Sequence, residues 1–153
     1  MYKIHPYNPQ RHRNEVLEIF KSRPDIFPSN EIDQITEGSN FSSTNNHYKI
    51  VAESDNKVAG FTDVLLNSQN IWMLNWLAVG DLFQKQGVGS SLVNLIIEWL
   101  LKKGVKELQV QTCSCDGEAP ARAFYEKRGF VPIKTEKNGY GKGHSKITFL
   151  KEL

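Results

Sequence analysis

Several features that would assign a sequence to a class at once are scarce or missing in this chain. It has only two cysteines in 153 residues, which argues against a disulfide-stabilised framework. Its longest apolar runs are broken by charged residues well short of membrane-spanning length, and the first residues, MYKIHPYNPQRHR, contain no signal-peptide core. These absences predict a cytoplasmic protein with no membrane partner.

Blocks of like charge are also missing. The formal net charge is +2, and the basic residues are scattered along the chain instead of forming a stripe or an arm. A nucleic-acid-binding domain usually concentrates its lysines and arginines, so this pattern argues against a nucleic-acid partner. The hydrophobic fraction of 39% is ordinary. The length suits one domain over residues 1–153, which would bury roughly 70% of its unfolded surface.

The two cysteines, Cys113 and Cys115, stand one residue apart in TCSCDG. A disulfide between them would close a very small ring, and no further cysteine or paired histidine completes a zinc-binding set. We therefore expect no metal site and reduced thiols in a loop. A redox or substrate-facing role is the alternative.

Hydrophobic periodicity predicts the element order β-α-α-β-β-β-α-β-α-β-β. The expected strands cover residues 2–7, 47–54, 57–66, 71–79, 105–112, 130–136 and 145–153. The expected helices cover residues 10–22, a short segment capped by Ser29, the stretch that follows Gln84 and ends near Gly104, and residues 119–129. This order predicts an α/β fold in which a mixed, mostly antiparallel sheet is covered by helices.

The stretch QKQGVGSSLVNLIIEWLLKKG, residues 84–104, joins a polar turn to a helix that is apolar over most of its surface. Such a helix lies against the sheet, and its first turn leaves backbone N–H groups without partners. Those groups and the helix dipole favour an anion such as a phosphate. Gly87 and Gly89 would let the backbone approach that anion closely, although two glycines can equally mark a tight strand-to-helix turn.

Two better-known phosphate motifs do not fit this stretch. It lacks the spacing and the Gly-Lys-Ser/Thr of the Walker loop. It also lacks the third glycine of a dinucleotide fingerprint, and the preceding strands form a meander instead of a βαβ unit. Nucleotide binding of either kind is therefore not expected.

Two longer motifs resemble the Gcn5-related N-acetyltransferase (GNAT) family. LAVGDLFQKQGVGSSLV resembles its acetyl-CoA signature, with Gln84, Gly87 and Gly89 at the three signature positions, and APARAFYEKRGF resembles its second motif. Together with the element order, the resemblance covers nearly the whole chain. It implies the GNAT-like acyl-CoA N-acyltransferase fold and an acetyl-CoA-dependent N-acetyltransferase that acts by direct attack of a primary amine.

The resemblance also implies where the cofactor binds. Backbone amides of the signature turn would hold the coenzyme A pyrophosphate, and the preceding strand would pair with the pantetheine amides. A backbone N–H near Val79 would stabilise the oxyanion. Lys85 would add a charge near a phosphate, or remain a solvated surface lysine. The full expected set is Leu77, Ala78, Val79, Gln84, Lys85, Gln86, Gly87, Val88, Gly89, Ser90 and Tyr125.

Tyr125 matches the family tyrosine that protonates the departing thiolate. The alternative is that Tyr125 is a core residue of its helix.

Asn75 stands where many members carry a glutamate, and an amide cannot accept a proton at neutral pH. Asp63, Asp116, His144 or a chain of water molecules could take the role, so the base stays unassigned. Glu118 replaces a frequent family asparagine and either assists the ligands or complements the positive end of a helix.

In this fold the segment 11–38 and the hairpin KNGYGKGHSK usually form the walls of the acceptor pocket. The expected substrate-binding residues are Asn75, Phe27, Tyr140 and His144. Further aromatic and acidic residues in these segments, Phe41, Asp25, Glu31 and Asp33, would suit a cationic amine, either a small molecule or a peptide.

The alternative function is a catalytically silent acyl-CoA-binding sensor or interaction module. A homodimer is compatible with either function.

Overall fold

The computed structural model describes residues 1–153 and contains one seven-stranded sheet in the order β1-β2-β3-β4-β5-β7-β6. The strands are β1 (Lys3–Pro6), β2 (His47–Ser54), β3 (Lys57–Leu66), β4 (Trp72–Val79), β5 (Glu107–Cys113), β6 (Val131–Glu136) and β7 (Lys146–Glu152). The helices are α1 (Pro9–Lys21), α2 (Ser29–Gly38), α3 (Val88–Lys102) and α4 (Ala119–Lys127), with short 3-10 turns at Asp81–Phe83 and Asp116–Glu118. The predicted order and the mixed sheet are confirmed.

Local sequence signals explain most of the element boundaries. Asn8 caps α1 by accepting hydrogen bonds from the N–H groups of the first turn, and Asp55 and Asn56 take the positive φ angles that a two-residue hairpin needs. Gly104 follows α3 in the left-handed conformation, as predicted. The predicted cap of α2 is wrong. Ser29 is the first helical residue, Pro28 precedes it at the cap position, and no side chain caps this helix.

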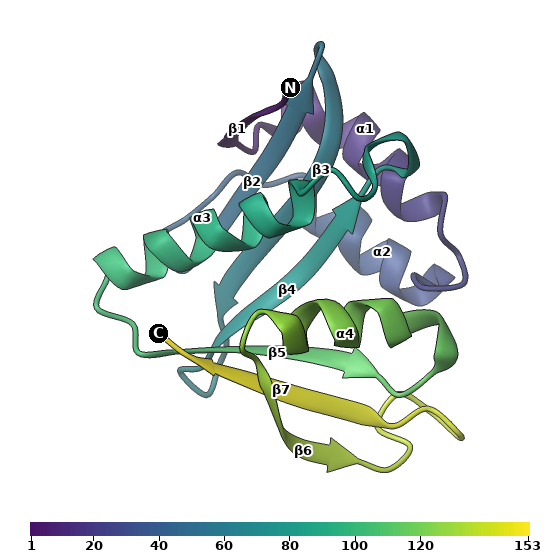
Figure 1. Cartoon of the computed structure of the whole chain (residues 1–153). Helices are drawn as coiled ribbons and strands as arrows, with labels where there is room; N and C mark the ends of the chain where they lie inside the picture. Colours follow the sequence, from purple (N-terminus) through teal and green to yellow (C-terminus); the bar gives the residue numbers. More distant parts are fainter.

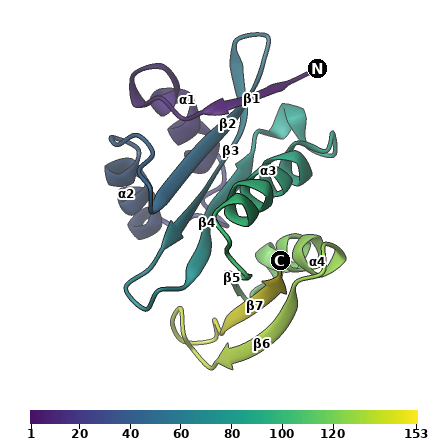
Figure 2. The ribbon, with the colours of Figure 1, turned by 90° about the vertical axis from the view of Figure 1, so that its left-hand side faces the viewer.

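Helices cover both faces of the sheet. Figure 2 shows α1 and α2 on one side of the sheet and α3 and α4 on the other. The larger core cluster has 15 buried residues and lies between the sheet and the α3–α4 layer, while a cluster of nine fills the α1–α2 side. α3 rests directly on β3 because Gly60 presents no side chain there: a Cβ atom would lie only 3.0 Å from Val88 Cγ1 and 3.1 Å from Leu92 Cδ1.

The sheet is divided at the junction of β4 and β5. These parallel strands pair at only two positions, Met73 with Gln109 and Leu74 with Val110, and then diverge (Figure 1). The register between β3 and β4 also shifts here, so that Asn75 is an extra, bulged residue. As a result, the edge of β4 that faces β5 is unpaired from Asn75 to Val79.

None of the four helices combines the length and the apolar character that crossing a bilayer requires.

Candidate active site

A cleft of about 760 Å³ opens where β4 and β5 diverge. Its walls come from the approach to α2, the middle of β4, the end of β5, one face of α4 and the β6–β7 hairpin. This volume is typical of pockets that bind small molecules. The cleft brings together six of the expected cofactor-binding and substrate-binding residues, namely Phe27, Asn75, Leu77, Tyr125, Tyr140 and His144.

The remaining acceptor candidates divide between the cleft and the outer surface. Asp25 and Glu31 line the cleft, whereas Asp33 and Asp116 do not. Phe41 also lies outside it, with 63% of its surface exposed. Thus only part of the predicted aromatic and acidic set can meet a substrate.

Tyr125 is held rigidly on α4. Its ring packs edge-on against Phe124, with a centroid distance of 5.3 Å, and against Phe130, at 5.4 Å. Burial raises the pKa of its hydroxyl, the nearby Glu118 raises it further, and Arg128 acts in the opposite direction. Tyr125 therefore keeps its proton at neutral pH, and it lines the cleft. A general acid requires both a proton and a place beside the reacting atoms.

The turn from Gln84 to Gly89 presents a row of free backbone donors. None of the N–H groups from Lys85 to Ser90 donates to an acceptor within the chain, and no side chain caps α3. Gly87 is the cap residue, with a φ of 80°. Two side chains fix this row: Gln84 Nε2 donates to the Val79 carbonyl at 2.7 Å, and the Tyr2 hydroxyl donates to the Gly87 carbonyl at 3.1 Å.

Arg128 adds a positive charge beside this row. Its guanidinium group lies 3.5 Å from the centroid of the Phe124 ring and donates to the Phe124 carbonyl at 2.9 Å and to Ser90 Oγ. Sequence reasoning missed Arg128. Its only signal was a place three residues after Tyr125 in the second motif, and spacing alone could not show that the end of α4 meets the start of α3.

The donor row and the cleft are separate regions that β4 connects. Residues 84–90 do not line the cleft, and Asn75 lies about 13 Å from Val79 along the strand. Two members of the expected cofactor set face elsewhere, because the side chain of Ala78 packs in the α1–α2 cluster and Val88 is buried in the larger core. Their backbones alone are available to a ligand.

Asn75 is fixed by a buried carboxylate. Asp63, which is 2% exposed, accepts hydrogen bonds from Asn75 Nδ2 at 3.0 Å, from the Trp76 N–H at 2.9 Å and from His47 Nε2 at 2.5 Å. Because Asn75 turns its amide nitrogen to Asp63, its Oδ1 has no partner within the chain. Asp63 therefore lies behind Asn75, outside the cleft, and orients it.

Two carboxyl groups in the cleft have raised pKa values. Burial raises the pKa of Glu31, and the charge of Glu118 raises it further. Burial also raises the pKa of Glu118, against hydrogen bonds from the Cys113 N–H and the Cys115 thiol. Glu118 is the residue at the N-terminal cap position of α4, but its side chain makes no capping hydrogen bond and instead accepts one from the Cys113 N–H at the end of β5.

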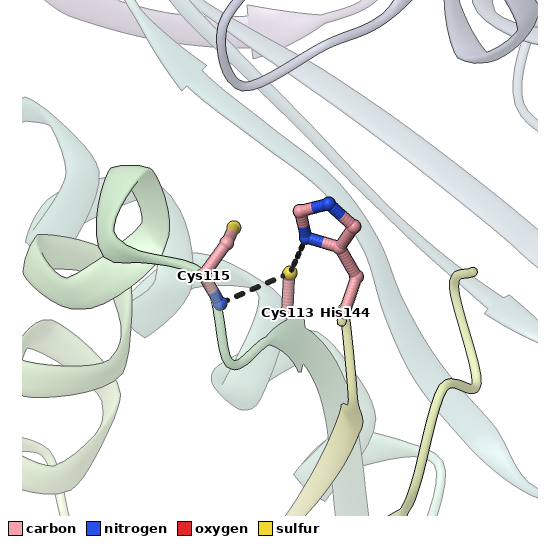
Figure 3. A group of neighbouring side chains, drawn as sticks. All are labelled: Cys113, Cys115 and His144. Carbon is pink, nitrogen blue, oxygen red and sulfur yellow. Dashed lines mark hydrogen bonds between the residues drawn. The ribbon is translucent and has the colours of Figure 1, made fainter. Parts of the chain in front are cut away.

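Both cysteines are free thiols, as expected, but Cys113 is the buried last residue of β5 and does not lie in a loop. Its sulfur lies 3.7 Å from His144 Nδ1 and accepts a hydrogen bond from the Cys115 N–H at 3.1 Å. Figure 3 shows the Cys113 sulfur between the Cys115 thiol and the His144 ring.

A helix N-terminus with free amides and an unpaired strand edge suit an extended ligand that carries a phosphate group. The model of the Acetyltransferase (GNAT) family matches residues 13–130. The chain therefore belongs to the GNAT family of acetyltransferases, as its two motifs implied. A comparison with curated proteins gave no match.

Solved structures agree with this fold. An acetyltransferase of the GNAT family from Desulfovibrio desulfuricans superposes with a TM-score of 0.90 at 23% identity, over 99% of both chains. The ribosomal-protein-S18-alanine N-acetyltransferase from Escherichia coli has a TM-score of 0.78 at 22% identity, over 99% of this chain and 94% of that one. A structure described as a streptothricin acetyltransferase from Bacillus anthracis, in complex with acetyl coenzyme A, has a TM-score of 0.66 at 21% identity. The match covers 72% of this chain and 65% of that one. At these identities the likeness shows the fold alone.

Proposed function

We propose that this acetyltransferase transfers the acetyl group of acetyl-CoA to a primary amine by direct attack through a tetrahedral intermediate. One observation carries the proposal. A row of free backbone N–H groups, Lys85 to Ser90, stands at the end of β4, and the unpaired edge of β4 leads from it to a cleft that contains Tyr125.

The free N–H groups and the positive end of α3 suit a pyrophosphate, and Arg128 supplies a full charge beside them. The unpaired edge of β4 offers N–H and C=O groups to the amides of an extended pantetheine arm, as a neighbouring strand would. Bound in this way, the thioester would arrive in the cleft near Leu77 and Tyr125. The acetyl-CoA bound in the Bacillus anthracis structure supports this choice of cofactor.

In the chemical step, the amine nitrogen attacks the thioester carbonyl carbon and the carbonyl oxygen becomes an oxyanion. A backbone N–H near Val79 stabilises that oxyanion. The carbon–sulfur bond then breaks, and Tyr125 gives its proton to the departing thiolate. Glu31 and Glu118 line the same cleft, and their raised pKa values suit them to accept the proton of the amine.

The walls of the cleft favour a cationic acceptor. Phe27, Trp76 and Tyr140 provide aromatic surface, and Glu31 and Glu118 provide negative charge. The free Oδ1 of Asn75 can accept a hydrogen bond from the amine and so direct its lone pair. Two structural neighbours are named for a small-molecule and a protein substrate, which is consistent with either kind of amine.

A second candidate, a silent acyl-CoA-binding module, is favoured by a single observation: Asn75 occupies the position where a family glutamate would act as base. Both candidates bind acetyl-CoA. Only the enzyme releases free CoA when an acceptor amine is added.

The test is a panel of polyamines, aminoglycosides, amino acids and peptides, assayed for thiol release from acetyl-CoA. The proposal predicts that at least one amine raises the rate well above that of acetyl-CoA with protein alone. The Tyr125→Phe protein is the control, because it should bind acetyl-CoA and release thiol slowly. Acetyl-CoA binding without thiol release for every class of amine would favour the silent module.

A further inference from the structure

Two cysteines and a histidine meet at the acceptor side of the cleft, in a cluster that acetyl transfer does not use. Cys113 Sγ, Cys115 Sγ and His144 Nδ1 all lie within 4.8 Å of one another (Figure 3), and all three residues line the cleft. We propose that Cys113, Cys115 and His144 form a Zn²⁺-binding site with three protein ligands and a fourth position open to the cleft.

The spacing of the donor atoms fits a tetrahedral zinc ion. Zinc binds sulfur at about 2.3 Å and imidazole nitrogen at about 2.0–2.1 Å, so a tetrahedron places these two ligands about 3.6 Å apart. Cys113 Sγ and His144 Nδ1 are 3.7 Å apart. The thiol of Cys115 completes the set after a small side-chain rotation, because its sulfur is already within 4.8 Å of both.

The backbone fixes the two segments that carry these ligands. Cys113 pairs with Lys146 at the end of the β5–β7 ladder, and the Ser114 N–H donates to the Ser145 carbonyl at 2.9 Å. The Ser145 N–H donates in return to Ser114 Oγ at 3.0 Å. His144 is therefore held opposite the two cysteines although 31 residues separate it from Cys113, and this is why their spacing in the sequence did not predict a metal site.

The chemistry of the ligands selects the metal. Two thiolates and an imidazole favour a borderline-soft ion such as Zn²⁺ over Mg²⁺ or Ca²⁺, which prefer oxygen ligands. Glu118 Oε2 lies 3.7 Å from Cys115 Sγ and orients this thiol from the side. Because the fourth position faces the cleft, bound zinc would lie beside the acceptor amine and join the β6–β7 hairpin to β5.

The experiment titrates Co²⁺ and then Zn²⁺ into reduced, metal-free protein. We expect one Co²⁺ per chain with a thiolate-to-cobalt charge-transfer absorption, and displacement of that ion by Zn²⁺ with loss of the visible bands. Mg²⁺ should not displace it. If the reduced, folded wild-type protein gives no such absorption, the proposal is wrong.

Variants locate the site. His144→Ala changes an exposed hairpin residue and should weaken Zn²⁺ binding at least about tenfold, since even loss of an outer partner commonly costs this much. Cys113→Ser/Cys115→Ser should abolish the charge-transfer absorption. His5→Ala, a half-exposed histidine on β1, is the matched control and should bind as the wild type does. Unchanged binding in both cluster variants would place the metal elsewhere and overturn the assignment.

Discussion

At the scale of single residues, Tyr125 combines a buried ring with a place in the wall of the cleft. Tyr125→Phe keeps the ring and its packing, so folding and acetyl-CoA affinity should hold. The lost proton donor should lower kcat by about 10²- to 10⁴-fold, which is roughly 3–5 kcal/mol of barrier. Steady-state kinetics and calorimetric titration with acetyl-CoA check the two halves of this prediction. An unchanged kcat would exclude Tyr125 as the acid.

Glu31 should make the KM for a cationic amine depend on pH. Burial and the charge of Glu118 raise the pKa of Glu31 above its ordinary value of 4.5, so its negative charge is present only above that raised pKa. The KM for a cationic amine should therefore rise as the pH falls through this value. Glu31→Gln should raise KM at neutral pH and flatten the profile.

The matched control for Glu31 is Asp33→Asn. Asp33 lies on the same helix but outside the cleft, so its removal should leave the KM profile of the amine as in the wild type. If both variants change KM equally, the effect is a general loss of negative charge and Glu31 has no special place in acceptor binding.

At the scale of elements, cofactor binding depends on the row of free N–H groups at the start of α3. A Cβ atom at Gly89 would lie 3.4 Å from the Phe124 ring and 3.7 Å from Val79 Cγ2, so a valine would project between these residues beside the free N–H groups. Gly89→Val should weaken acetyl-CoA binding more than about tenfold, or over about 1.4 kcal/mol. Gly38→Val is the control, because no atom lies within 4 Å of its added Cβ. Near-native affinity in a folded Gly89→Val protein would move the pyrophosphate elsewhere.

The close packing of α3 against β3 depends on Gly60 and affects stability rather than cofactor binding. Gly60→Ala would place a Cβ atom 3.0 Å from Val88 Cγ1 and 3.1 Å from the Ala78 carbonyl oxygen. Such overpacking typically costs about 1–3 kcal/mol, and each kcal/mol lowers Tm by about 2–4 °C in a chain of this size. Thermal unfolding without ligand measures the effect. A Tm equal to that of the wild type would mean that α3 can shift away from β3 without cost.

At the scale of the whole molecule, the parts that could be predicted are those that local sequence determines. Asp55 and Asn56 predicted a hairpin, and Gly104 predicted the end of a helix. The two motifs predicted the elements on which Gln84 and Tyr125 are found. The predicted cap at Ser29 was wrong because Pro28 already fixes an extended backbone before α2.

What could not be predicted depends on contacts between distant segments. Asp63 was not recognised as the partner of Asn75, because that contact depends on how β3 and β4 pair across the hairpin. His144 reaches the cysteines through the pairing of β5 with β7. Arg128 reaches Ser90 because α4 packs beside the start of α3. In each case, tertiary structure created the relationship.

In the proposed reaction the amine attacks the thioester directly, and the protein is never acetylated. Its most direct test is a single-turnover measurement with protein in excess over acetyl-CoA, performed with and without the best amine from the panel. Direct attack predicts no burst of free CoA without amine, and one acetylated amine for each CoA released when amine is present. A stoichiometric burst of CoA without amine, with one acetyl group retained on the protein by mass spectrometry, would contradict direct attack and would point to Cys113 beside His144 as the acetyl carrier.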